Sequence, residues 1–165
     1  MLSIWLIPTA ETSAKLSALI HDLSKTYSTD NFLPHITLLS GIMDIENQAV
    51  AKLTRWAKQL KPIQAELTSV EYLELYYKCL FFNAAESAEL LLLREQAEQL
   101  FNHTNVQPFI PHVSFLYGNL PLFKQQEIIS GLGADFLQTI RLDKIQLVRT
   151  IHAVENWELL VEIAL

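Results

Sequence analysis

One ten-residue segment occurs twice in the chain. Residues 32–41 read FLPHITLLSG, and residues 109–118, 77 positions later, read FIPHVSFLYG. Phe, Pro, His, Leu and Gly coincide without a gap, and a hydroxyl residue stands two positions after each histidine. The 165 residues include only five histidines, so finding two of them in matched windows indicates a duplicated structural unit.

Strand and helix patterns take turns on either side of both copies. Short apolar or alternating runs, closed by Pro, Asn or Gly, predict strands at residues 3–7, 35–40, 63–75, 78–83, near 112, 139–149 and 156–163. Apolar residues at helical spacing, with capping and stop signals, predict helices at 10–26, from Asp44 to before Pro62, at 87–101 and from Pro121 to Gly131 or Gly133. This order predicts one compact unit, either α+β or α/β with interleaved elements.

Composition narrows the class of protein further. Half of the residues are apolar and 18% are charged, which excludes a disordered or low-complexity chain. The net charge of −6 argues against binding that depends mainly on phosphate neutralisation along a nucleic acid. Cys79 is the single cysteine, so an internal disulfide and a multi-cysteine metal site are excluded. No segment of the sequence is typical of a membrane span or signal peptide, and we expect a cytoplasmic protein without membrane partners.

Strand geometry assigns a direction to the repeated residues. Side chains at positions i and i+2 of a strand point to the same face, so His35 should project with Thr37, and His112 with Ser114. Each histidine follows a proline that keeps the chain extended. If the two units pack about a pseudo-two-fold axis, the two His-hydroxyl pairs face each other across one cleft.

Two facing imidazoles and two hydroxyls suit phosphodiester chemistry. One ring can accept a proton from water while the other protonates the departing sugar oxygen, and the hydroxyls can donate to phosphate oxygens. This reaction needs no metal and no cofactor. Zinc is a weaker interpretation, because no third or fourth ligand stands at a recognisable spacing. The chain also lacks the Gly-x-Ser-x-Gly nucleophile motif, which counts against an ordinary serine hydrolase.

The paired motifs Pro34-His35-Ile36-Thr37-Leu38 and Pro111-His112-Val113-Ser114-Phe115 resemble the signatures of the two-histidine (2H) phosphoesterase superfamily. The opening strand and the segment Tyr76-Tyr77-Lys78-Cys79-Leu80 look most like its cyclic phosphodiesterase branch. The resemblance implies a LigT-like α+β fold, bilobal, with two pseudo-symmetric strand-helix lobes whose antiparallel sheets face a central cleft. It further implies that residues 1–165 form a single domain with an internal duplication.

The resemblance also implies roles for the matched residues. His35 and His112 are expected to be the acid/base pair, and Thr37 and Ser114 to hold the non-bridging phosphate oxygens. Trp5, Tyr76 and Tyr117 are expected to line the nucleotide pocket, where aromatic faces stack on a base. The near-symmetry of the motifs leaves open which histidine starts as the base.

The implied activity is metal-independent hydrolysis of a small cyclic phosphodiester, either a 2',3'-cyclic nucleotide or ADP-ribose 1'',2''-cyclic phosphate, by a monomer. Two alternatives stay open. One is an enzyme acting on RNA ends as a 2',3'-cyclic phosphodiesterase or 2'-5' RNA ligase-like protein, and the other is a catalytically silent nucleotide-binding module. Among the remaining candidates, we interpret His21, His103 and His152 as core or surface residues and Lys78 as an exposed edge lysine.

Overall fold

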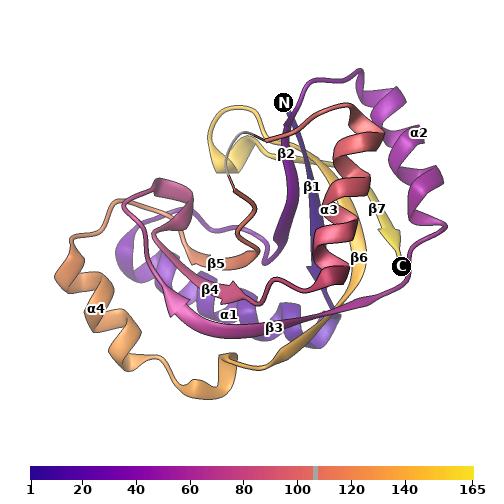
Figure 1. Cartoon of the computed structure of the whole chain (residues 1–165). Helices are drawn as coiled ribbons and strands as arrows, with labels where there is room; N and C mark the ends of the chain where they lie inside the picture. Colours follow the sequence, from indigo (N-terminus) through magenta and orange to yellow (C-terminus); the bar gives the residue numbers. More distant parts are fainter. Residues whose placement is uncertain (106–107) are drawn as a thin grey trace.

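The computed structural model describes residues 1–105 and 108–165. They form an α+β fold in which helices and strands are interleaved along the chain (Figure 1). The strands are β1 Leu2–Pro8, β2 Ile36–Ile42, β3 Ile63–Glu71, β4 Leu80–Ala84, β5 His112–Leu116, β6 Thr139–Arg149 and β7 Glu158–Ala164. The helices are α1 Ala10–Tyr27, α2 Glu46–Ala57, α3 Ala88–Phe101 and α4 Leu122–Gly131, with 3₁₀ turns at Tyr76–Lys78, Ala134–Phe136 and Val154–Asn156.

The strands form one antiparallel sheet that closes on itself. Their order is β1-β2-β5-β4-β3-β6-β7, and a further pairing of β1 with β6 closes the first six into a barrel. Strand β6 makes this closure possible because its first residues pair with β3 while its later residues pair with β7 on one side and β1 on the other. The predicted α+β class is therefore confirmed. The described strands pair as one sheet, so the predicted division into two lobes with separate sheets is not confirmed and stays a prediction.

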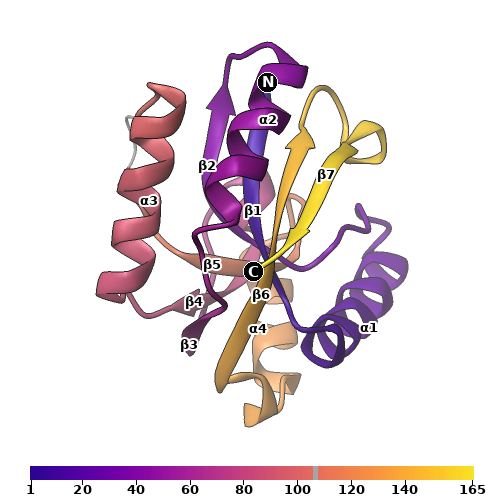
Figure 2. The same cartoon turned by 90° about the vertical axis from the view of Figure 1, so that its right-hand side faces the viewer.

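The strand pairings have an internal symmetry. Exchanging β1 with β4, β2 with β5 and β3 with β6 maps the β2–β5 and β3–β6 pairings onto themselves and every other pairing of the barrel onto another one. The helices follow the same rule, since α1 packs against β5 and α3 packs against β2. Figure 2 shows α1 and α3 on opposite sides of the barrel. This exchange symmetry supports the proposal that the single domain arose by internal duplication.

The barrel has one face that packs against the helices and one that does not. Ile4, Ile36 and Val113 are fully buried in the main core, which also contains buried residues of α1, α2 and α3. Trp5 points the other way and forms a separate small cluster with Ile7 and Val148. Because side chains alternate along a strand, the residues on either side of Ile36 and Val113 belong to the face without helices.

Several predicted strand boundaries differ from the structure: β3 ends at Glu71 and not at residue 75, and two further differences lie near the histidine motifs. Strand β2 begins at Ile36, so His35 lies just before it, where Pro34 has removed a ladder donor. The predicted strand at 78–83 begins at Leu80, because residues 76–78 form a 3₁₀ turn in which the Lys78 amide donates to the Leu75 carbonyl. Lys78 is partly buried in this turn, so its interpretation as an exposed edge lysine was wrong.

Candidate active site

The two repeated segments are neighbours in the sheet. Strands β2 and β5 pair antiparallel through Ile36 and Val113, the residues that directly follow the two histidines. Because Ile36 and Val113 both point into the core, His35 and Thr37 project from the opposite face, as do His112 and Ser114. A single antiparallel contact therefore brings all four repeated polar residues onto one face of the barrel, around the axis that relates its halves.

Both histidines are held by the same local hydrogen bond. His35 Nδ1 lies 2.6 Å from the Leu33 carbonyl oxygen, and His112 Nδ1 lies 2.7 Å from the Ile110 carbonyl oxygen. A carbonyl can only accept, so Nδ1 carries the proton in each ring. The extended backbone around each proline sets this contact between a histidine and the residue two positions before it. In the neutral rings Nε2 is left as the basic atom.

His35 is almost completely buried. Its ring stacks on the indole of Trp5, with 3.8 Å between ring centroids and an angle of 12° between planes. Trp5 reaches it because β1 pairs with β2 and places Trp5 opposite Thr37. The pKa of His35 is lowered from 6.5 to about 4, mainly by burial; the bond to Leu33 opposes this shift, and the neighbouring His112 makes a smaller contribution to it. Free His35 is therefore neutral at pH 7.

His112 has a different environment. It is half-buried and makes an edge-to-face contact with Phe81 of β4, whose centroid lies 5.1 Å away. The pKa of His112 is lowered to about 4, mainly by burial and in smaller part by the positive charge of Lys78. The hydrogen bond to Ile110 again opposes the shift.

The two hydroxyls also differ. Ser114 is buried and donates to the Tyr77 carbonyl oxygen at 2.9 Å, so its hydroxyl is engaged in the free protein. Thr37 is partly exposed, and its hydroxyl forms no hydrogen bond within the described part of the chain. The Thr37 hydroxyl is thus available to a ligand without breaking a protein contact.

A group of aromatic side chains borders the histidines. Trp5 and Tyr117, two of the three aromatics expected to line a nucleotide pocket, are 5% and 3% exposed. Trp5 covers His35, and Tyr117 stacks on Phe32 with 3.6 Å between ring centroids. Burial raises the pKa of Tyr117. Their contact with substrate stays a prediction, and their faces are already occupied by protein.

The exposed members of the aromatic group are Tyr76 and Tyr77. Tyr76, the third predicted pocket residue, is 37% exposed and donates to Asp30 Oδ2 at 2.7 Å, a bond that raises its pKa to about 12. Tyr77 is 48% exposed and lies 5.8 Å from Trp157, centroid to centroid, which in turn contacts Trp5. The sequence analysis missed Tyr77 and Trp157. The tandem Tyr76-Tyr77 was a signal for the first, but no local pattern distinguishes Trp157 from an ordinary residue of a strand end.

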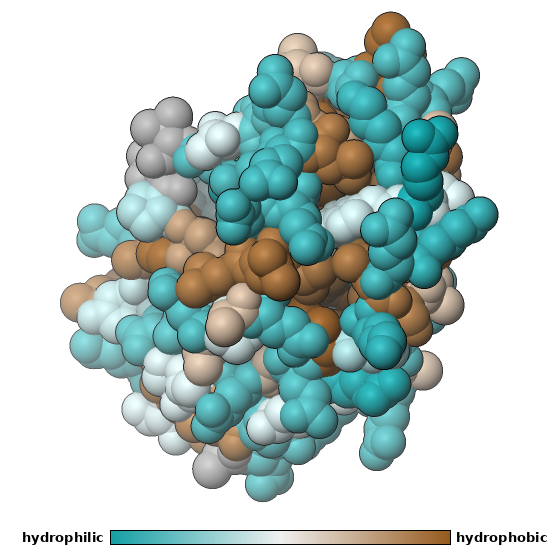
Figure 3. Space-filling model, turned by 45° about the vertical axis from the view of Figure 1, so that its right-hand side comes forward, coloured by the Kyte–Doolittle hydropathy of each residue, from teal (hydrophilic) through white to brown (hydrophobic). Residues whose placement is uncertain are grey.

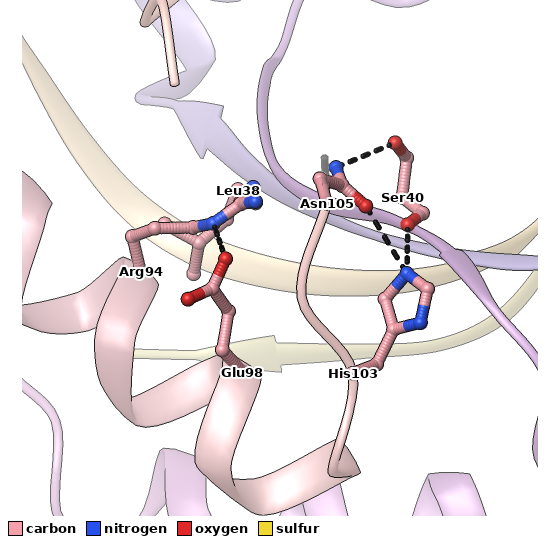
Figure 4. Close-up of polar contacts among 6 residues, drawn as sticks. All are labelled: Leu38, Ser40, Arg94, Glu98, His103 and Asn105. Atoms are coloured by element: carbon pink, nitrogen blue, oxygen red, sulfur yellow. Dashed lines mark hydrogen bonds and ion pairs between the residues drawn. The ribbon is translucent and has the colours of Figure 1, made fainter. Parts of the chain in front are cut away.

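The remaining histidines lie outside this site. His21 and His152 are exposed, whereas His103 places Nε2 2.9 Å from the Ser40 carbonyl oxygen and 3.1 Å from Asn105 Oδ1 (Figure 4). His103 therefore joins the segment after α3 to the end of β2.

Helix α3 is anchored to the same strand by a buried arginine. Arg94 donates to the Leu38 carbonyl oxygen and pairs with Glu98 at 2.7 Å (Figure 4). The bond crosses from the helix to the strand that carries Thr37. The pair thus supports the motif strand from the core side and does not enter the reaction site.

A groove with both apolar and polar lining residues lies between α2 and α3. Its lining includes Trp56, Leu60, Leu92 and Leu100, and neither repeated histidine. Figure 3 shows a band of hydrophobic surface between hydrophilic regions.

The described residues contain no cluster of three or more His, Cys, Asp or Glu side chains suited to a metal ion. Over the same residues, no helix combines the length and apolar character needed to cross a membrane.

A closed antiparallel barrel that joins two His-x-hydroxyl strands on one face is the architecture of the two-histidine phosphoesterase class. Comparison of the fold agrees: Escherichia coli LigT in its apo form superposes with a TM-score of 0.63 over 99% of this chain and 95% of that chain, at 13% identity. LigT complexed with 3'-AMP gives 0.62 over 99% and 96%, at 12% identity. The chain belongs to the cyclic phosphodiesterase-like protein family, whose model matches residues 1–165.

A curated relative points to the same branch. A protein of Arabidopsis thaliana named cyclic phosphodiesterase is 24% identical over 118 residues, which are 72% of this chain and 65% of that protein. The match thus spans slightly less than two-thirds of the relative. The predicted superfamily and branch are confirmed, and the family agrees with the predicted enzyme class, a hydrolase of cyclic phosphodiesters.

Proposed function

We propose that this protein hydrolyses a cyclic phosphodiester of a nucleotide to the corresponding phosphomonoester, with His35 and His112 as the acid/base pair. The observation that carries the proposal is the mirrored arrangement of the two rings. Both have Nδ1 bonded to a backbone carbonyl, both leave Nε2 as the reactive atom, and both belong to the same face of the barrel. General acid/base catalysis needs two such fixed proton carriers near the phosphate.

The reaction then proceeds by attack of water on phosphorus. One imidazole Nε2 takes a proton from water as the new P–O bond forms, and the other gives a proton to the ribose oxygen as its bond to phosphorus breaks. Thr37 and Ser114 donate hydrogen bonds to the non-bridging oxygens. Ser114 rotates away from the Tyr77 carbonyl to do so, whereas Thr37 is already free of such a bond. No metal ion or cofactor takes part in this scheme.

We assign His112 as the base and His35 as the acid. Lys78 favours the neutral form of His112, and the half-buried position of His112 gives water access to its ring. The Trp5 face against His35 stabilises a protonated ring by a cation–π interaction. Because burial keeps free His35 neutral at pH 7, the acid takes up its proton together with the anionic substrate, whose charge raises the pKa of the ring.

The proposed substrates are 2',3'-cyclic nucleotides and ADP-ribose 1'',2''-cyclic phosphate. The exposed rings of Tyr76 and Tyr77 offer faces for a base beside the histidines. The similar fold of LigT, which has been solved with 3'-AMP, supports a mononucleotide ligand. The net charge of −6 disfavours a long RNA strand, so RNA ends are the second choice. We further propose a monomer with a cytoplasmic location.

The test is hydrolysis of 2',3'-cyclic AMP in the presence of a chelator by wild type, His35→Ala and His112→Ala. Each substitution should reduce kcat/KM by about 10²–10⁴-fold, because each removes one proton carrier. His21→Ala removes an exposed histidine of α1 and is the matched control, which should retain wild-type activity. Turnover that survives both motif substitutions contradicts the mechanism, and turnover lost in chelator contradicts metal independence.

Substrate choice is tested with the same four proteins. ADP-ribose cyclic phosphate and an oligonucleotide with a 2',3'-cyclic end should be compared with the mononucleotide. A preference for the oligonucleotide would favour the RNA-end alternative. Nucleotide binding without turnover of any of the three would favour the silent binding module.

A further inference from the structure

The 3₁₀ turn Tyr76–Lys78 is fixed against the second motif by two hydrogen bonds. The Gly118 amide donates to the Tyr76 carbonyl oxygen, and the Ser114 hydroxyl donates to the Tyr77 carbonyl oxygen, both at 2.9 Å. Immediately after the turn, β4 pairs with β5 and places Phe81 opposite Ser114. The backbone next to Lys78 is thus held at the edge of the site by Ser114 and Gly118 of the second motif.

Lys78 carries a positive charge into this position without a matching acid. Its side chain is partly buried, and within the described residues its ammonium group forms no ion pair or hydrogen bond. Burial lowers the pKa of Lys78. Withdrawing a charge from water without a partner costs free energy, and an anion at that position would remove the cost.

Three other basic residues near the barrel differ from Lys78 in this respect. Arg94 pairs with Glu98, Lys144 with Glu162, and Arg149 with both Glu46 and Glu158. Their charges are neutralised within the protein, and none contributes to the lowered pKa of either motif histidine. The positive charge of Lys78, by contrast, lowers the pKa of His112. A phosphate bound near His112 would therefore meet the positive charge of Lys78.

We propose that the Lys78 ammonium binds the phosphate of substrate and product on the His112 side of the site. This inference rests on the proposed function and adds a residue to it. A lysine ammonium acts on phosphate as a compact point charge, so its attraction grows with the charge of the phosphate group. Lys78 should therefore favour the dianionic monoester and inorganic phosphate over the monoanionic cyclic diester.

The competing explanation is that the lysine stem merely covers apolar surface while its charge reaches water. Two substitutions separate the alternatives. Lys78→Met keeps an unbranched apolar chain and removes the charge, whereas Lys78→Arg keeps the charge. Lys58→Met, at an exposed position directly after α2, removes the same charge elsewhere and is the matched control.

The experiment is a calorimetric titration of each protein with inorganic phosphate, with thermal unfolding to confirm that each variant is folded. Lys78→Met should weaken phosphate binding by about tenfold, equivalent to ~1.4 kcal/mol, whereas Lys78→Arg and Lys58→Met should stay close to wild type. Equal phosphate affinity in folded Lys78→Met and wild type would overturn the proposal, as would a wild type that binds no phosphate.

Kinetics then separate this inference from the proposed function. If wild type hydrolyses 2',3'-cyclic AMP, Lys78→Met should raise KM and weaken inhibition by phosphate more than it lowers kcat. If wild type hydrolyses no cyclic phosphate, the proposed function fails, while the phosphate titration still decides the role of Lys78.

Discussion

The two halves of the barrel present the same motif in different surroundings. In both, a histidine after proline donates Nδ1–H to a carbonyl two residues earlier. In the first half, β1 supplies Trp5, which stacks on His35 and buries it. In the second, β4 supplies Phe81 at the edge of His112, and the preceding turn supplies Lys78.

The difference explains how nearly identical motifs can take unlike roles. The residues within the motif determine the tautomer and the face of the sheet, which are the same in both halves. The neighbouring strand determines exposure and charge, which are not. In the proposed mechanism, the internal symmetry provides two equivalent proton carriers, and residues outside the repeat make one of them suited to donate and the other to accept.

The largest expected effect tests this division of roles directly. On a 2',3'-cyclic nucleotide, both His35→Ala and His112→Ala should lose about 10²–10⁴-fold in kcat/KM. On a p-nitrophenyl phosphodiester, the leaving group departs without protonation, so the loss in His35→Ala should shrink to less than about tenfold while that in His112→Ala persists. The measurement is kcat/KM of wild type and both variants on the two substrates.

The opposite pattern would reverse the assignment, with His35 as the base. Equal losses on both substrates would mean that the unlike surroundings do not divide the roles. Either outcome leaves the paired-histidine mechanism in place, but it contradicts the claim that the surroundings of each half make His35 the acid and His112 the base.

The pH dependence of kcat/KM gives the next largest effect. The active free enzyme needs one neutral and one protonated histidine, and burial lowers both pKa values from 6.5 to about 4. The protonated fraction is small at pH 7, so kcat/KM should increase by roughly tenfold per pH unit as the pH falls from 7 towards 5. Lys78→Met removes a cation that lowers the pKa of His112. The limb of the pH profile that reports protonation of His112 should therefore move to higher pH.

Stability must be followed over the same range. The folded state binds protons more weakly at both histidines than the unfolded state does, so stability is lost as the pH falls from about 6.5 towards 4. Thermal unfolding at each pH separates this loss from the kinetic effect. A kcat/KM that is constant from pH 5 to 8 in folded enzyme would contradict the lowered pKa values.

The sequence predicts those features of the site that depend on neighbouring residues, and it does not predict those that depend on contacts between distant segments. The repeat predicts the four polar residues and their common face, because strand alternation is local and because matched segments predict matched structures. The same reasoning predicts the α+β class and most helices. It does not predict that Ile36 pairs with Val113, since no local pattern in either segment specifies its partner strand.

The surroundings of the histidines depend on contacts that are distant in sequence. Trp5 could be selected from the resemblance, but its stacking on His35 follows from the pairing of β1 with β2. Lys78 was assigned to a strand because its neighbours are apolar and aromatic, whereas the Lys78–Leu75 backbone bond closes a 3₁₀ turn there. Trp157 reaches the site from the start of β7, more than a hundred residues from His35 in the chain.

The smallest expected effect compares the two hydroxyls. Thr37→Ala removes a donor that has no protein partner, so it should lower kcat/KM by about tenfold, equivalent to one ~1.4 kcal/mol interaction, and leave stability unchanged. Ser114→Ala removes the bond to the Tyr77 carbonyl as well, so it should also lower the free energy of unfolding by about 1 kcal/mol. Since wild-type Ser114 must break that bond to reach phosphate, its kinetic loss should be smaller than that of Thr37→Ala. Urea unfolding and kcat/KM of the two variants check both halves of the expectation, and an equal kinetic loss would mean that the Ser114–Tyr77 bond does not compete with substrate.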